Sequence, residues 1–249
     1  MCRHLAYLGP PLSLAELLTT PPHSLYEQSW APKCQVGGTV NADGFGVGWY
    51  PPDDGAGPVR YRRAVPIWAD ENLPGLAALL HSGAVLASVR STTPGGSNHE
   101  TAVAPFALGR WLFSLNGRVD RWEQLPTDLG EPLTLAELLS IEAHVDAALL
   151  WLMAARRLVA GQPAPEALAE LVAGVLAARP DARLNLLLTD GSTVVATRHG
   201  DSLWYRSEDE RLIVASEPVP EQPGWREVPE HSLLRASRTS VDLQALPRL

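Results

Sequence analysis

The sequence predicts an α+β protein, because its expected strands and helices are clustered along the chain rather than alternating. Predicted strands come first, two helices follow, and short strands return towards the C-terminus. Regular alternation would instead indicate a parallel sheet covered by helices. No segment rich in Pro, Gly or Ser divides the 249 residues cleanly, so we expect one domain over residues 2–249.

The N-terminal part predicts several strands. Residues 3–8 are apolar enough for a strand, and the Gly-Pro-Pro sequence at 9–11 is expected to end it. Residues 36–50 predict a Gly-rich loop that leads into a strand. Further strands are expected at residues 59–65, 84–92 and 110–117.

Two six-residue segments share a helix-capping pattern. In SLAELL, Ser13 stands three residues before Glu16, and in TLAELL, Thr134 stands three residues before Glu137. This spacing lets the hydroxyl and the carboxylate each accept from the other residue's main-chain N–H. We therefore expect each segment to start a helix, and shared capping chemistry explains their likeness without an internal repeat.

The middle of the chain predicts two longer helices. The first runs from about Asp146 to Val159, with apolar residues at helical spacing and Gly161 beyond its end. The second starts near Pro165 and ends before Pro180. From residue 183 onward, short apolar runs between turn residues predict a meander of antiparallel strands.

Charge and composition exclude several classes of function. The net charge of -8 argues against a nucleic-acid partner. No apolar run reaches the roughly 18 residues that a membrane span needs. The N-terminus has no secretory signal, and two cysteines make no disulfide framework, so the expected compartment is the cytoplasm. Nothing in the sequence indicates an oligomeric state.

No cofactor or metal is expected either. His4, His99 and His144 match no metal-ligand spacing. The DGFGVG segment resembles part of a dinucleotide fingerprint, but it lacks the strand–loop–helix context and the downstream acidic residue.

Cys2 directly follows the initiator methionine, in a chain whose only other cysteine is Cys34. A small residue at position 2 permits removal of Met1, which leaves an α-amino group beside the Cys2 thiol. Because an α-amino group titrates near about 7.7 to 8.0, it can take the thiol proton and later return it to a leaving amine. The alternative is that Cys2 is a small buried hydrophobic residue.

Asn116-Gly117 follows an apolar run and has two interpretations. Asn-Gly between apolar stretches is the strongest short signal for a hairpin turn. An Asn side-chain amide and the next main-chain N–H are also the donors that stabilise an oxyanion. Both roles can coexist at one tight turn.

Two charged positions likewise have a structural and a functional interpretation. Arg90 ends a predicted strand, either as an ordinary ion-pair arginine or as a fork that binds a substrate carboxylate, with the Thr93 hydroxyl close by. Asp146 opens the long helix, either as its N-cap or as a carboxylate that binds a substrate ammonium.

These segments occur in an order that resembles a known family. Cys2-Arg3, DGFGVGW, the Arg-Ser-Thr-Thr stretch at Arg90, Asn116-Gly117 and VASEP follow one another as in class II glutamine amidotransferases, which are N-terminal-nucleophile hydrolases. The resemblance implies a four-layer αββα sandwich with Cys2 at the edge of a sheet.

The same resemblance implies a role for each residue. Cys2 would attack a γ-glutamyl amide carbon and form a thioester, while Asn116 and Gly117 hold the oxyanion. Arg90, with Thr93, would bind the glutamyl α-carboxylate. Asp146 would bind the α-ammonium.

Three departures from the family pattern flank these residues. Leu115 replaces a usual His, TAVAP at 101–105 replaces a usual Asn-Ala-His-Pro stretch, and VDAA at 145–148 replaces Ser-Asp-Ser-Glu. The oxyanion donors and the carboxylate survive these changes. We therefore expect the differences to affect which leaving group is accepted.

Longer segments resemble a narrower group, the stand-alone amidohydrolases of bacterial ergothioneine biosynthesis: CRHLAYLG, VRSTTPGG, DAALLWLM and VASEP. This implies release of glutamate from γ-glutamyl-hercynylcysteine sulfoxide, whose trimethylammonium group favours an aromatic wall. Trp30, Trp68, Trp111 and Trp122 are the candidates, with core packing as the alternative for each. Two other functions stay open: a glutaminase subunit that passes ammonia to a synthase, and a non-catalytic γ-glutamyl-binding protein.

Overall fold

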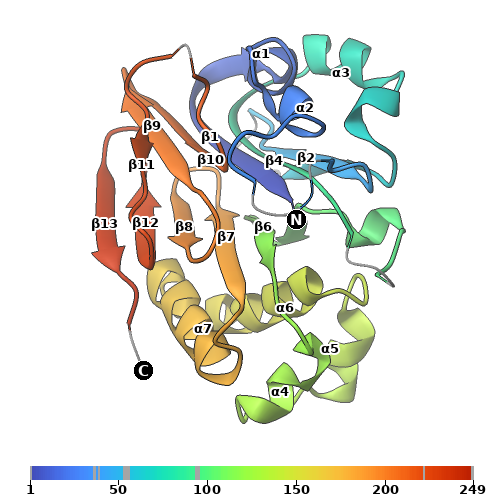
Figure 1. Cartoon of the computed structure of the whole chain (residues 1–249), viewed down its shortest axis with the longest axis vertical. Helices are drawn as coiled ribbons and strands as arrows, with labels where there is room; N and C mark the ends of the chain where they lie inside the picture. The colour runs from blue at the N-terminus through green and yellow to red at the C-terminus, as the bar shows by residue number, and fades with distance from the viewer. Residues whose placement is uncertain are drawn as a thin grey trace.

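Two antiparallel sheets lie at the centre of the structure, a computed structural model that describes residues 2–35, 38, 40–52, 57–92, 96–220 and 222–247. Helices lie at the two ends of the longest axis, with the sheets between them (Figure 1). Together these layers form the α+β, four-layer αββα sandwich that the sequence predicted.

The first sheet carries the N-terminus on one of its central strands. In spatial order it contains β11 (Arg226–Glu227), β9 (Trp204–Glu208), β10 (Arg211–Ala215), β1 (Arg3–Ser13), β4 (His81–Val89), β2 (Phe45–Trp49) and β3 (Val59–Arg63). Its helices are α1 (Leu14–Leu18), α2 (Leu25–Gln28) and α3 (Leu73–Leu79).

The second sheet is built from the later strands. In spatial order it contains β13 (Val241–Ala245), β12 (Ser232–Ala236), β8 (Val194–Arg198), β7 (Arg183–Thr189), β6 (Trp111–Arg118) and β5 (Phe106–Leu108). Its helices are α4 (Leu125–Asp128), α5 (Leu135–Ser140), α6 (Asp146–Val159) and α7 (Ala164–Ala178), with the predicted bounds of the two long helices confirmed to within a residue or so.

Three apolar clusters fill the three spaces between layers. Tyr7 belongs to the cluster under α1–α3, whereas its neighbours Ala6 and Leu8 belong to the cluster between the sheets. This is the alternation of side chains expected along a strand. A third cluster packs α6 and α7 on the second sheet. Because β1 is buried on both faces, its sequence is apolar almost without interruption.

The predicted end of the first strand at residues 9–11 is wrong. β1 continues to Ser13, and its register against β4 shifts between Leu8 and Leu12. A bulge accommodates residues that cannot donate to the ladder, as prolines cannot. The Gly-Pro-Pro sequence therefore interrupts the pairing without ending the strand.

The predicted C-terminal meander is wrong in its connections. β7 pairs with β8 in the second sheet, whereas β9 pairs with β10 in the first. The chain thus crosses from one sheet to the other after β8. Short apolar runs predict strands, but which sheet receives each strand depends on packing. No helix in the described ranges has the length and apolar character needed to cross a membrane.

Candidate active site

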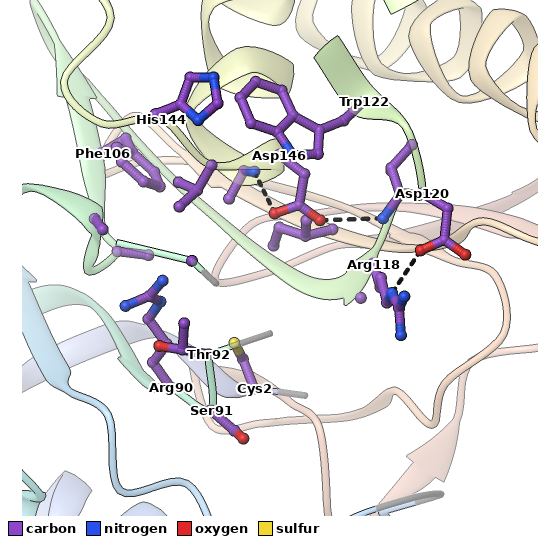
Figure 2. A pocket seen from close by; sticks show the side chains of 18 of the residues that line it. Cys2, Arg90, Ser91, Thr92, Phe106, Arg118, Asp120, Trp122, His144 and Asp146 are labelled. Atoms are coloured by element: carbon purple, nitrogen blue, oxygen red, sulfur yellow. Dashed lines mark hydrogen bonds and ion pairs between the residues drawn. The ribbon is translucent and has the colours of Figure 1, made fainter. Parts of the chain in front are cut away.

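The register of the first sheet brings Cys2 and Arg90 together. β1 and β4 are antiparallel with Arg3 opposite Val89, so the residue before β1 and the residue after β4 lie at the same sheet edge. Both line a cavity of about 340 Å³. Figure 2 shows the Cys2 sulfur pointing into this cavity, with Asp146 on the opposite wall.

Asn116-Gly117 does not form the expected hairpin turn. β6 runs through both residues to Arg118, and they pair with Asn185 and Leu184 of β7. A Cβ atom at position 117 would lie 2.0 Å from the carbonyl oxygen of residue 183. Glycine is therefore required here by the close approach of β7 rather than by a turn.

The main-chain N–H of Gly117 points away from β7. Leu184, its partner across the ladder, donates its own N–H to His199 on the β8 side. In an antiparallel pair, two facing residues either bond to each other through both their N–H and C=O groups, or both direct these groups away from each other. Gly117 therefore directs its N–H to the other edge of β6, which β5 covers only as far as Phe113.

Asn116 is fully buried behind the cavity wall rather than on it. A carbonyl can only accept and a guanidinium can only donate. The orientation that satisfies both neighbours is therefore assigned to Asn116: its amide donates to the main-chain oxygen of Cys2 and accepts from Arg3 Nη1 at 3.3 Å. Asn116 thus ties β6 of the second sheet to the residue that carries the thiol.

Arg90 lies at the side of the cavity with 9% of its surface exposed. Its Nη1 donates to the carbonyl oxygen of Ser97 at 2.8 Å. A guanidinium has five N–H donors, so this contact leaves donors for a ligand. Figure 2 shows the guanidinium directed into the cavity.

Asp146 is not the N-cap of α6, because Val145 occupies that position. Its carboxylate accepts from the main-chain N–H of Val119 at 3.0 Å and of Ala147 at 2.8 Å. Desolvation raises the pKa of Asp146, while these two hydrogen bonds and the positive charge of Arg90 oppose the rise. A carboxylate has about four acceptor sites, so an ammonium can still be bound.

Thr93 lies outside the described residues. Its neighbours Ser91 and Thr92 line the cavity, and the main-chain N–H of Thr92 donates to Asp43 Oδ2 at 2.7 Å.

The mouth of the cavity carries an aromatic pair. Trp122 and His144 contact edge to face, with ring centroids 4.6 Å apart, and both line the cavity. Trp30 and Trp68 instead contact each other elsewhere, and Trp111 borders a separate hollow. Of the four tryptophans considered above, Trp122 is therefore the one that lines the same cavity as Cys2.

Several residues that depart from the family pattern also line this cavity. Leu115, Ala104, Val145 and Ala147 all line the cavity. The changes replace polar groups of the pattern with apolar ones, so they alter the surface that a bound molecule meets.

Comparison with known proteins agrees with this arrangement, although no family model matches the chain. A γ-glutamyl-hercynylcysteine sulfoxide hydrolase of Mycobacterium tuberculosis is 39% identical over 248 residues, covering 100% of this chain and 98% of that protein. The protein of the same name from Mycolicibacterium smegmatis is 40% identical over 234 residues, covering 94% and 95%. The chain belongs to the γ-glutamyl-hercynylcysteine sulfoxide hydrolase family.

A solved structure extends the likeness of this hydrolase family to the class II amidotransferases. The glutamine aminotransferase class-II domain protein from Silicibacter pomeroyi matches with a TM-score of 0.70 and 25% identity, covering 99% of this chain and 100% of that one. The predicted resemblance to both groups is thereby confirmed.

A buried charged cluster that the sequence did not predict lies behind Cys2. Arg3 Nε lies 3.3 Å from Glu217 Oε1, and Glu217 Oε2 lies 2.7 Å from His23 Nε2. Desolvation acts to raise the pKa of Glu217, but hydrogen bonds from His23 and the main chain, with the charge of Arg3, lower it overall. Two features of the sequence could have indicated this cluster: an arginine inside an apolar strand, and the acidic residue of VASEP.

His4 is a structural residue on the inner face of β1. It is fully buried, and its Nδ1 lies 2.8 Å from Ser114 Oγ. Burial, with a smaller effect of the Arg3 charge, lowers the pKa of His4 to about 3, so its ring is neutral at physiological pH. Across the part of the chain that the structure describes, no group of three or more His, Cys, Asp or Glu side chains is arranged to hold a metal.

Proposed function

We propose that this chain hydrolyses the γ-glutamyl amide bond of γ-glutamyl-hercynylcysteine sulfoxide and releases glutamate. The observation that carries the proposal is that Cys2, Arg90, Gly117 and Asp146 line a single cavity in a chain of this hydrolase family. The reaction needs one small-molecule substrate, no metal and no cofactor, and we assign it to the cytoplasm. The acting unit would be one glutamine-amidotransferase domain over residues 2–249.

The nucleophile in this proposal is the Cys2 thiolate, and the base is its own α-amino group after removal of Met1. The amine takes the thiol proton, and the sulfur attacks the γ-carbonyl carbon. Collapse of the tetrahedral intermediate breaks the C–N bond, and the amine's proton passes to the leaving nitrogen. Water then attacks the thioester, which releases glutamate and restores the thiol.

The oxyanion of the intermediate would be held by two donors on adjacent residues of β6. One is the N–H of Gly117, a residue that lines the cavity and whose N–H points away from β7. The other is the Asn116 amide, which has two N–H groups and uses one on the Cys2 carbonyl. Donors fixed in paired strands need no reorganisation when the charge develops.

The glutamyl head would be recognised by charges of opposite sign on opposite walls. We assign the α-carboxylate to the Arg90 fork, with the hydroxyl of Thr93, and the α-ammonium to Asp146. The spacing between a carboxylate site and an ammonium site selects an amino-acid head over a simple carboxylic acid.

The leaving group would extend to the mouth of the cavity. Its trimethylammonium group cannot donate hydrogen bonds, so it is best stabilised by an aromatic face and by nearby carboxylates. Trp122 supplies such a face, and Asp120 and Glu123 line the same mouth.

The test is to incubate the purified protein with γ-glutamyl-hercynylcysteine sulfoxide and, separately, with glutamine, and to measure released glutamate. We expect turnover of the first to exceed that of the second, and none in Cys2→Ala. Intact mass should show loss of Met1 and, after rapid quenching, a glutamyl adduct in the wild type alone.

Two outcomes would favour the alternatives. Efficient hydrolysis of glutamine with none of the sulfoxide would indicate a glutaminase subunit. Binding of γ-glutamyl compounds without any release of glutamate, together with retained Met1, would indicate a binding protein.

A further inference from the structure

Arg3 is an unusual residue to find beside a nucleophile, because it is charged and has no exposed surface. It does not line the cavity, so within the described structure it is not placed to touch the substrate. A buried guanidinium is retained only where its donors are used. Its Nε donates to Gln35 and forms an ion pair with Glu217, and its Nη1 donates to Asn116.

We propose that Arg3 is a positioning residue that sets the orientation of the Asn116 side-chain amide and so presents its N–H groups to the reacting centre. The inference rests on the proposed function, because amide orientation matters to catalysis only if Asn116 donates to the oxyanion.

A side-chain amide has two ends of similar shape. Its oxygen and nitrogen are nearly equal in size, so partners decide which end points where. Arg3 Nη1 lies 3.3 Å away and can only donate, so it favours the oxygen of Asn116 on its side. The Cys2 carbonyl can only accept, so it favours the nitrogen on its side. Reversal would bring two donors together at Arg3 and two acceptors together at Cys2.

Arg3 can impose this choice because its own position is held firmly. Its Nε donates to Gln35 Oε1 at 3.1 Å and lies 3.3 Å from Glu217 Oε1. Glu217 is held in turn by His23 and by the main-chain N–H of Lys33, at 2.7 Å in each case. The guanidinium is therefore held through its Nε by groups other than Asn116.

The chemical consequence concerns the transition state more than substrate binding. With the amide in the orientation that Arg3 and Cys2 together favour, its second N–H is the donor that the proposed function assigns to the oxyanion. In the reversed orientation an oxygen would face that charge and repel it. Loss of Arg3 should thus lower kcat and leave KM nearly unchanged.

The test is a double-mutant cycle with Arg3→Lys and Asn116→Ala, measured as kcat and KM for γ-glutamyl-hercynylcysteine sulfoxide. Lysine keeps a positive charge opposite Glu217 but lacks the planar fork. We expect Arg3→Lys to lower kcat roughly tenfold in the wild-type background and less than about twofold in the Asn116→Ala background, as for residues that act through one contact. Losses that multiply, or that appear in KM alone, would overturn the inference.

Matched variants keep the cycle interpretable. Arg157 of α6 is another largely buried arginine, which pairs with Glu131 away from the cavity. Arg157→Lys should therefore leave kcat unchanged. Intact mass must show that Met1 is removed from every variant. If Arg3→Lys does not fold, Glu217→Gln replaces it in the cycle, with a smaller loss of kcat that again disappears in Asn116→Ala.

Failure of the proposed function and failure of the role of Arg3 would give different results. Absence of glutamate release from the wild-type protein would overturn the proposed function, and this inference with it. Normal wild-type turnover combined with multiplicative losses would overturn the role of Arg3 alone.

Discussion

The inner end and the mouth of the cavity are held by the fold in different ways. At the inner end, Cys2 directly precedes β1, Gly117 belongs to β6, and Asn116 behind them is fully buried. At the mouth, Asp120 and His144 lie in the connections after β6 and before α6, and both are exposed.

This difference indicates a division of labour. Groups fixed by strand pairing suit the part of the substrate that every γ-glutamyl compound shares. Groups in connecting segments suit the part that varies, because connections tolerate change without loss of the core. Variants of the inner end should therefore affect all γ-glutamyl substrates alike, and variants of the mouth should discriminate among leaving groups.

The largest expected effect among binding and oxyanion residues comes from Asn116→Ala. Removal of one oxyanion donor should lower kcat by roughly 100- to 1000-fold. The factor should be similar for γ-glutamyl-hercynylcysteine sulfoxide and for glutamine, because the lost contact is to the shared carbonyl. Steady-state kinetics on both substrates measures it. Turnover at the wild-type rate would remove Asn116 from the oxyanion site.

Asp146→Asn should weaken binding of γ-glutamyl compounds by roughly 10- to 100-fold, the value of a charge-assisted hydrogen bond. The wild-type affinity should also depend on pH. Desolvation raises the pKa of Asp146, so the carboxylate becomes protonated at a higher pH than an ordinary Asp and loses its attraction for the ammonium. Affinity should therefore fall as the pH is lowered through this raised pKa.

Calorimetry on Cys2→Ala, which binds without turnover, isolates this effect from the chemistry. The double variant Cys2→Ala/Asp146→Asn is the matched control and should show weak, nearly pH-independent affinity over the same range. A pH dependence that persists in the double variant would assign it to another group.

Arg90→Lys should raise KM by about tenfold, because lysine replaces a planar fork with a point charge. The expected loss is confined to compounds that have an α-carboxylate. A γ-aminobutyryl amide, which keeps the ammonium but lacks the α-carboxylate, should be hydrolysed poorly but equally by the wild type and the variant. An equal loss on both compounds would indicate a structural role for Arg90.

The fold could be predicted from the sequence where neighbouring residues determine the structure, and not where distant residues determine it. SLAELL and TLAELL each form the predicted capping box, with Ser13 bonded to Glu16 and Thr134 bonded to Glu137. Their leucines nevertheless differ in environment. Those of α1 are all buried, whereas Leu135, Leu138 and Leu139 of α5 are 72%, 57% and 78% exposed. Capping depends on neighbours in sequence, and burial depends on what the fold places nearby.

The site shows the same limit. The ordered motifs were enough to select Cys2, Arg90, Gly117 and Asp146, which the structure brings to one cavity. The turn expected at Gly117 failed because the approach of β7, not local preference, determines that backbone. The ion pair of Arg3 and Glu217 could not be predicted, because the two residues lie near opposite ends of the chain and meet only when β1 pairs with β10.

The smallest expected effect, and the most direct test of the division of labour, is that of Trp122→Ala. A cation–π contact at a partly exposed site contributes about 0.5–1 kcal/mol, so KM for γ-glutamyl-hercynylcysteine sulfoxide should rise roughly two- to fivefold. Glutamine has no cationic leaving group, and its kcat/KM should not change. The ratio of the two kcat/KM values is therefore the quantity to measure. Trp68→Ala, a tryptophan 39% exposed and outside the cavity, should leave this ratio unaltered. Equal losses on both substrates would mean that Trp122 supports the inner end instead of reading the leaving group, and the boundary between the two regions would have to be drawn further out.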